Sequence, residues 1–405
     1  MPRAIALWCI LMLGGCSESN RAAVEGLRPT SAHWIDPANE FSPSTLWGHF
    51  SFDELSFPTP TEGWIVGDKF ILHVVSDDLN VTFLRPTGAW LKAVAFRTAD
   101  DGWVAGSRLP RGVLWRYANG LWEPADIRVN WPDWYVRSVW VSPQAVWARA
   151  SVTEEGLGPD VAKRRRSVLL HSEDGAGWRV DDSPQLDAGR WSFNDACFYT
   201  SDEGWFVGLE RPEPNVVRAL AVLRRNGQWH QTRLPELDGP DARLQEVVCL
   251  NNGHAVALGV SGGEVYHPSQ PVLLRHDGDR WQQIELPQAF RRAEIGAMAA
   301  LSDSDVWLAV SNVVALQDRR ATFLHLSGGE WKEVAPPMLP DGDEVGYVFS
   351  DMQFVSPDEG WAIANVSRGR GLARGLIFHY RDGEWRNRNW NWHFWNEPWF
   401  GLLGY

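Results

Sequence analysis

Positive charge, tyrosine and clustered metal ligands are all scarce in this chain of 405 residues. Lysine and arginine number 38 against 51 aspartates and glutamates, and the formal net charge of −13 argues against a general nucleic-acid binder. No His/Cys set has metal-ligand spacing, and no nucleophile elbow or phosphate-binding loop occurs. The sequence therefore indicates no metal, no cofactor and no nucleic-acid partner. Beyond the first residues, no segment is long and apolar enough to cross a membrane.

Tryptophan, in contrast, is abundant: the chain has 25, and most fall at repeating positions. A short phrase, in its clearest copies an acidic residue followed by Gly-Trp and an apolar run, returns about every 50 residues. The markers of its seven copies are Trp64, Trp103, Trp147, Trp205, Val256, Trp307 and Trp361. A period of this length, built of short strands and turns, is typical of a propeller in which each repeat is one blade.

Two further elements complete each repeat. Before each marker, apolar residues recur with a period of two, which predicts a strand with one buried face. Seven residues before the markers stand Phe57, Phe96, Trp140, Phe198, Cys249, Ala300 and Phe354, and nine before them Leu55, Val94, Ser138, Ala196, Val247, Met298 and Met352. After most markers comes an apolar run, then Asn-Gly or a related pair, then an aromatic residue, which signals a hairpin because its tight turn needs positive φ. The sequence thus predicts an all-β, seven-bladed β-propeller of four-stranded antiparallel blades over residues 46–390.

Four histidines, His73, His171, His325 and His379, occupy one equivalent position in different blades. Residues at equivalent positions of different blades cannot converge, so we interpret them as strand residues and not as metal ligands. The wide, flat tryptophan side chains are expected to fill the wedges between blades.

The first residues of the chain predict its location in the cell. Met1-Pro2-Arg3 is a short basic start, and residues 4–13 form an apolar run too short to span a bilayer. Leu-Gly-Gly-Cys, ending at Cys16, resembles the lipobox of bacterial lipoproteins. That resemblance implies a signal peptide over residues 1–15, lipidation of Cys16 and a tether over residues 16–45. It also implies a lipid-anchored protein of the bacterial cell envelope; Ser17 resembles the outer-membrane sorting pattern, facing the periplasm or the cell exterior.

Two cysteines remain, Cys197 and Cys249. An exported chain allows a disulfide between them. They precede the markers of adjacent blades by eight and seven residues and so point to opposite strand faces. Adjacent blades also present opposite faces to each other, so the sequence leaves open both a bridge and two buried thiols.

The repeats resemble those of the photosystem II assembly and stability factor propellers, within the wider bacterial neuraminidase (Asp-box) repeat proteins. The likeness rests on the Glu-Gly-Trp phrase of residues 62–64 and 359–361 and on the Leu-Leu-His…Gly…Trp phrase of residues 169–178. It implies a non-catalytic propeller that holds protein partners during assembly through a basic patch on one face. The chain departs from the Asp-box pattern, because residues 171–178 are one residue short of it.

Basic residues gather in the predicted loops between the second and third strands, at 149–167, 208–220, 259–271, 310–322 and 364–375. Those loops hold twelve basic and seven acidic side chains, although the whole chain is acidic. We name as the basic rim Arg164, Arg165, Arg166, Arg319, Arg320, Arg368, Arg370 and Arg374. Lys92, Arg137, Arg190, Arg243, Arg291 and Arg292 lie in or near the outer-to-inner connections, which emerge at the same end of the propeller. These residues are either a solvated surface or a basic funnel that holds carboxylate or phosphate groups.

The sequence therefore favours a lipid-anchored propeller that binds a protein partner with an anionic surface, as an assembly or scaffold factor of the envelope. The alternative is a carbohydrate-active or glycan-binding propeller of the sialidase kind, which would need a Tyr–Glu nucleophile pair. Only seven tyrosines are present, and of these Tyr266 and Tyr347 fall near the expected rim. The aromatic tail, residues 391–405, either covers the seam between the first and last blades or is an exposed anchor.

Overall fold

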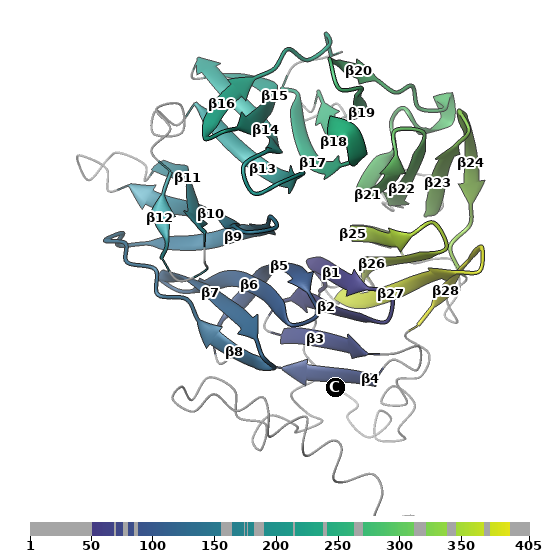
Figure 1. Cartoon of the computed structure of the whole chain (residues 1–405). Helices are drawn as coiled ribbons and strands as arrows, with labels where there is room; N and C mark the ends of the chain where they lie inside the picture. The colour runs from purple at the N-terminus through teal and green to yellow at the C-terminus, as the bar shows by residue number, and fades with distance from the viewer. Residues whose placement is uncertain are drawn as a thin grey trace, which may run out of the picture.

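The computed structural model describes residues 51–388, except 69, 76–79, 85–87, 155–163, 174, 176, 182–189, 214, 238–240, 263–269, 312–320, 338–345 and 368–372. Within this part the chain forms seven four-stranded antiparallel sheets arranged around a central axis (Figure 1). The predicted seven-bladed β-propeller is confirmed. The proposed signal peptide, the tether and the aromatic tail lie outside the described residues.

Each blade is built from four strands that are consecutive in the sequence. Blade 1 contains β1 (Glu54–Thr59), β2 (Glu62–Gly67), β3 (Phe70–Val75) and β4 (Asn80–Leu84). Blade 2 contains β5 (Trp90–Thr98), β6 (Asp101–Arg108), β7 (Arg111–Ala118) and β8 (Leu121–Pro124). Blade 3 contains β9 (Trp134–Val141), β10 (Val146–Glu154), β11 (Arg164–Ser172) and β12 (Arg179–Val180). Blade 4 contains β13 (Trp191–Phe198), β14 (Gly204–Glu213), β15 (Val216–Arg225) and β16 (Gln228–Gln231).

The last three blades follow the same order. Blade 5 contains β17 (Arg243–Cys249), β18 (Ala255–Ser261), β19 (Gln270–His276) and β20 (Trp281–Gln283). Blade 6 contains β21 (Glu294–Ser302), β22 (Asp305–Ser311), β23 (Thr322–Ser327) and β24 (Glu330–Val334). Blade 7 contains β25 (Gly346–Ser356), β26 (Glu359–Ser367), β27 (Ala373–Arg381) and β28 (Glu384–Asn387). Two single turns of 3₁₀ helix, η2 (Asn251–Gly253) and η3 (Gln288–Phe290), are the helical elements of the described chain.

In blade 2 the repeated phrase contains two glycines, Gly102 and Gly106, and a close contact with the inner strand explains each of them. A Cβ on Gly102 would lie 2.2 Å from the ring of Phe96, and one on Gly106 would lie 2.0 Å from the carbonyl oxygen of Trp90. The first glycine therefore leaves room for an aromatic ring of the inner strand. The second lets the inner strand's backbone approach the second strand closely.

The acidic residue and the tryptophan of the phrase form a ladder with the predicted strand histidines. Trp64 stacks on His73 with ring centroids 4.4 Å apart, and His73 Nε2 lies 2.9 Å from Glu62 Oε1. The same arrangement recurs in blades 6 and 7 through His325 and His379. The histidines thus lie in separate blades, which confirms that they are strand residues.

The tryptophan markers also join neighbouring blades. Trp64 stacks on Phe96 of the next blade at 3.7 Å, and Trp307 stacks on Phe354 at 5.1 Å. Each of these two tryptophans therefore lies between a histidine of its own blade and a phenylalanine of the next. The prediction that tryptophans fill the wedges between blades holds for them.

The predicted alignment of blade 3 is wrong by one residue. Trp140 pairs directly with Trp147, whereas each of the other six markers pairs with the residue eight positions before it. The physical reason is a shorter hairpin, in which Ser142 N–H donates to Ala145 O; the corresponding hairpin in blade 4 runs from Tyr199 to Glu203. Trp140 therefore corresponds to Cys197 in blade 4 and not to Phe198.

Candidate functional site: the central cavity

A cavity of about 710 Å³ lies on the propeller axis. Its lining includes residues of the first strand of every blade, or directly before it, namely β1, β5, β9, β13, β17, β21 and β25, which lie nearest the centre in Figure 1. Six of these inner strands carry a β-bulge there, at Lys92, Arg137, Asn194, Gln245, Gly296 and Ser350. Bulges re-aim side chains, and here they direct polar ones toward the axis.

Four carboxyl groups line this cavity at one equivalent position, the residue directly after the bulge or its counterpart in blade 1. Each accepts a hydrogen bond from a backbone N–H of the next blade's inner strand. The pairs are Glu54 with Val94 N at 3.0 Å, Asp195 with Val247 N at 2.8 Å, Glu246 with Met298 N at 3.0 Å and Asp351 with Leu55 N at 2.8 Å. The last pair joins blade 7 to blade 1, so these carboxyls connect blades as well as lining the cavity.

The four side chains are half-buried, and the surrounding blades desolvate them. Burial raises the pKa of Asp195 to about 6 and that of Asp351 to about 7. Burial also raises the pKa of Glu54 and of Glu246 well above the usual range, with the charge of Asp351 as the second cause in both. Each of these four carboxyls therefore keeps its proton to a higher pH than an exposed carboxyl does.

Four cations line the same cavity: Lys92 of β5, Arg137 of β9, Arg243 of β17 and Arg292, shortly before β21. Lys92 Nζ lies 2.7 Å from Asp53, and the Arg137 guanidinium lies over the ring of Tyr135 at 4.7 Å. Arg243 and Arg292 are exposed, and within the described part of the chain neither side chain has a hydrogen-bond or ion-pair partner. Two guanidinium groups at the cavity are therefore available to an anionic ligand.

These cations lie at the end of the propeller where the inner strands begin, which we call the cavity face. The turns between second and third strands reach the same end. Trp134 N–H donates to Pro110 O at 3.0 Å, and Arg211 N–H donates to Arg190 O at 2.7 Å. The first bond joins the turn between β6 and β7 to the start of β9 in the next blade, and the second joins the end of β14 to the residue before β13. Both kinds of connection therefore lie at the cavity mouth.

The structure covers the basic rim only in part. Arg319, Arg320, Arg368 and Arg370 lie outside the described residues. Arg164 and Arg165 begin β11 and Arg374 lies in β27, with only the backbone of these three described. Arg166 is half-buried in β11.

The predicted loops around residues 149–167 and 208–220 are wrong in extent. β10 continues to Glu154 and β11 begins at Arg164, while β14 continues to Glu213 and β15 begins at Val216. Arg149, which we expected in the first of these loops, is a strand residue that donates to Phe193 O and to Asn194 Oδ1 of blade 4. Burial lowers its pKa to about 10, so Arg149 stabilises the contact between blades 3 and 4 and is not part of an exposed basic surface.

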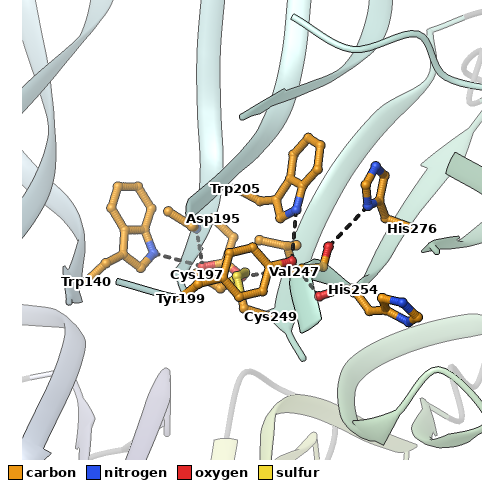
Figure 2. Close-up of a disulfide and its surroundings, with 11 residues drawn as sticks. Trp140, Asp195, Cys197, Tyr199, Trp205, Val247, Cys249, His254 and His276 are labelled. Atoms are coloured by element: carbon orange, nitrogen blue, oxygen red, sulfur yellow. Dashed lines mark hydrogen bonds between the residues drawn. A yellow bond between two sulfur atoms is a disulfide. The ribbon is translucent and has the colours of Figure 1, made fainter. Parts of the chain in front are cut away.

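The structure joins Cys197 and Cys249 in a disulfide between β13 and β17, one of the two arrangements that the sequence left open (Figure 2). Of the two tyrosines noted for a sialidase-like site, Tyr347 is buried against Phe349, and Tyr266 lies outside the described residues. Sequence reasoning missed the four cavity carboxyls. Their recurrence ten residues before four of the seven markers was the available signal.

Among the described residues, no group of three or more His, Cys, Asp or Glu side chains is placed to hold a metal ion. The same part of the chain has no helix long and apolar enough to span a membrane.

Searches of protein families and of curated proteins give no match for this chain. Solved structures do match it. A YCF48 chain bound to a D1 peptide is 15% identical with a TM-score of 0.52, covering 87% of this chain and 99% of that one. The propeller domain of the Trilobed protease from Pyrococcus furiosus is 10% identical with a TM-score of 0.52, covering 84% and 98%. A puromycin-hydrolyzing peptidase of Mycobacterium tuberculosis is 12% identical with a TM-score of 0.56, covering 87% of this chain and 55% of that one. At these identities the likeness shows the propeller fold alone.

Proposed function

We propose that this protein is a lipid-anchored, non-catalytic propeller that binds a protein partner at its cavity face, as an assembly or scaffold factor of the bacterial envelope. The observation that carries the proposal is the pair Arg243 and Arg292, exposed at the cavity. Guanidinium groups bind carboxylates in bidentate fashion, so the partner presents an anionic segment.

Three further observations support a partner of this kind. Basic residues are placed in the connections around the cavity mouth although the chain as a whole carries a net charge of −13. The hydrogen bonds that Pro110 O and Arg190 O accept lie among these connections at the cavity face. A solved YCF48 propeller, similar in fold, is bound to a D1 peptide, so a propeller of this architecture is able to hold a polypeptide segment.

The lipid anchor in this proposal rests on the sequence around Cys16. An acylated Cys16, followed by a polar tether, would hold the propeller beside the bilayer, with the outer membrane as the proposed location. Tethering near a membrane raises the effective concentration of the propeller for partners in the same membrane.

One observation favours a second function, a carbohydrate-active propeller. Asp195 and Asp351 line a polar cavity with raised pKa values, a property of general acids. Both carboxyls also accept backbone N–H groups from a neighbouring blade, which a structural role explains. Hydrolysis of sialosides or polyuronates by the purified protein, lost in Asp351→Asn, would establish this second function.

Affinity capture from detergent-solubilised native membranes tests the proposed function. We expect wild-type protein to capture a stoichiometric partner, and Arg243→Glu/Arg292→Glu to lose it without loss of folding, because exposed charges contribute little to stability. The matched control is Arg179→Glu/Arg280→Glu, which makes the same charge change at exposed arginines near the turns between third and fourth strands, on the opposite face. Equal capture by all three proteins would refute the proposal.

A further inference from the structure

The seams on either side of blade 5 lack the stacked Trp–Phe pair that joins four other pairs of neighbouring blades. Cys249 stands where Phe57, Phe96, Phe198 and Phe354 stand in other repeats. Those four phenylalanines stack on the tryptophan marker of the preceding blade. At the next seam, Val256 replaces the tryptophan and Ala300 the phenylalanine. Blade 5 must therefore be held to its neighbours by other contacts.

A covalent bond takes the place of the Trp–Phe stack between blades 4 and 5, where Trp205 instead contacts the rings of His276 and Trp281 of blade 5. Cys249 is joined to Cys197, with their Cα atoms 5.4 Å apart. Beside the disulfide, Tyr199 Oη donates to His254 O at 2.5 Å, and Trp205 Nε1–H donates to Tyr199 Oη at 3.1 Å (Figure 2). The marker Trp205 is thus engaged by a tyrosine of its own blade.

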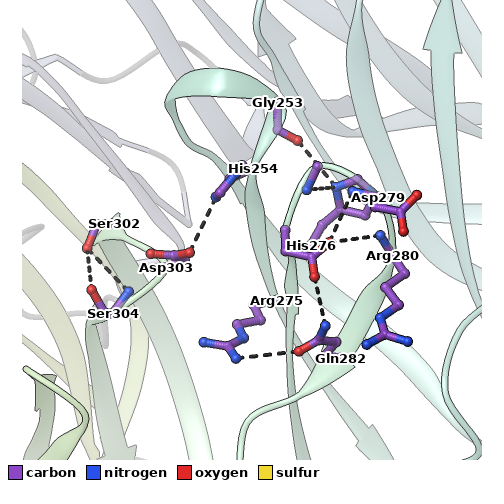
Figure 3. A network of polar contacts seen from close by, with 12 residues as sticks. Gly253, His254, Arg275, His276, Asp279, Arg280, Gln282, Ser302, Asp303 and Ser304 are labelled. Carbon is purple, nitrogen blue, oxygen red and sulfur yellow. Dashed lines mark hydrogen bonds and ion pairs between the residues drawn. The ribbon is translucent and has the colours of Figure 1, made fainter.

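The hairpin after Cys249 also contacts blade 6. His254 Nδ1 lies 3.3 Å from Asp303 Oδ2, and His276 Nδ1 lies 3.3 Å from Gly253 O within blade 5 (Figure 3). The segment from Cys249 to His254 therefore connects three successive blades at the end of the propeller opposite the cavity face, which we call the hairpin face. This segment lies at the two seams, between blades 4 and 5 and between blades 5 and 6, where the Trp–Phe stack is missing.

The disulfide borders a pocket on the hairpin face. A cavity of about 350 Å³ there is lined by Phe198, Tyr199, Glu203, Cys249, Leu250, Asn251 and Gly253. Cys249 belongs to this lining and Cys197 does not, so a reagent in the pocket contacts Cys249 and not Cys197. Asp195 and Val247 lie two residues before Cys197 and Cys249, and the Asp195 carboxylate accepts the Val247 N–H at 2.8 Å. Because Asp195 lines the central cavity, only two residues along each strand separate the disulfide from that cavity.

We propose that Cys249 is a thiol-exchange site and that the Cys197–Cys249 disulfide is a reducible latch between blades 4 and 5. A dithiol in the pocket attacks Cys249 Sγ as a thiolate, forming a mixed disulfide and releasing Cys197 as a thiolate. Its second thiolate then attacks its own sulfur in the mixed disulfide, which frees Cys249 and leaves the dithiol oxidised to a cyclic disulfide. The two cysteine thiolates take protons from solvent. This proposal does not depend on what the central cavity binds.

The site of attack is tested on the folded, oxidised full chain with reduced glutathione, a monothiol that stops at the mixed disulfide. After acid quenching, alkylation and peptide mapping, we expect the glutathione adduct on Cys249 and the alkyl group on Cys197. An adduct mainly on Cys197 would overturn the proposal. So would equal amounts on both cysteines, or two free thiols in the untreated protein.

The latch is tested by hydrogen exchange with and without dithiothreitol. Reduction is expected to raise exchange several-fold in β13 and β17 while leaving β1 and β25, at the opposite seam, unchanged. The matched variant is Cys197→Ala/Cys249→Ala, which cannot form the disulfide. We expect its exchange in β13 and β17 to equal that of reduced wild-type protein and to be unaffected by dithiothreitol. Unchanged exchange in reduced wild-type protein, or a variant that exchanges as slowly as the oxidised wild type, would refute the latch.

Discussion

Phe57 of the first inner strand stacks on Trp361 of the last blade, with ring centroids 4.4 Å apart and planes inclined by 9°. Nearby, Phe57 N–H donates to Gln353 Oε1 at 2.8 Å, and Asn365 accepts from Phe52 N and donates to Phe52 O, both at 2.8 Å. Blades 1 and 7 each take all four strands from consecutive sequence. Among the described residues, the ring is therefore closed by side-chain contacts across the seam, without a strand shared between the first and last blades.

The first prediction concerns this seam. Phe57→Ala removes a fully buried ring and is expected to lower the free energy of unfolding by about 3–5 kcal/mol. Urea denaturation measures the loss. Trp90→Ala is the control, because that side chain is 44% exposed and its removal should cost far less. Equal losses in the two variants would show that Phe57 does not close the ring.

The second prediction concerns the cavity carboxyls. Because burial raises the pKa of Glu246, the folded protein keeps a proton that the unfolded chain has already released. The Glu246 contribution to stability therefore falls as pH rises from the unfolded pKa toward the higher folded one. Glu246→Gln keeps the acceptor for Met298 N–H without the titration, so its stability relative to wild type should increase from pH 4.5 to pH 8.

Comparison with wild type is needed because several histidines act in the opposite sense. Burial lowers the pKa of His73 and of His379, so their contribution to stability rises with pH up to their unfolded pKa. These contributions cancel in the difference between variant and wild type. Glu330→Gln, at an exposed acid of β24, is the control and should show a flat difference. A flat difference for Glu246→Gln as well would contradict the account of the carboxyls.

The repeated phrase was sufficient for the blade count and strand order, because each of its seven markers falls in the second strand of one blade. The alignment of blade 3 was not accessible, since it depends on a hairpin shorter by one residue. The role of Arg149 was equally hidden. Its partners, Phe193 and Asn194, lie in another blade, and only the packing of blades 3 and 4 makes it a buried residue.

The third prediction concerns anchoring. Cys16→Ala should release the protein from membranes or leave it as an unprocessed precursor, because the proposed attachment depends on one lipidated residue. Fractionation of cells, followed by mass measurement of the protein, distinguishes these states. The lipoprotein assignment would be refuted by a Cys16→Ala protein that is fully processed and still fractionates with membranes.

The fourth prediction concerns the start of β11. Arg164→Glu/Arg165→Glu should weaken partner capture and flatten its dependence on salt, because attraction between exposed charges is screened over about 10 Å at 0.1 M ionic strength. Arg166 is left unchanged since it is half-buried. The proposal that these two arginines are solvated predicts a melting temperature within a degree or two of wild type. An unaltered salt profile of capture would mean that these arginines are only a solvated surface.

The central claim, that the cavity face holds the partner, is tested most directly by site-specific photo-cross-linking in native membranes. A photoreactive residue replaces Gln245, which is exposed at the cavity in β17, and in a second protein replaces Asp279, exposed at a turn on the hairpin face. We predict a single partner adduct from position 245 and none from position 279, with the adduct lost in the Arg243→Glu/Arg292→Glu background. An adduct from position 279 alone, or one from position 245 that persists in that background, would contradict the account.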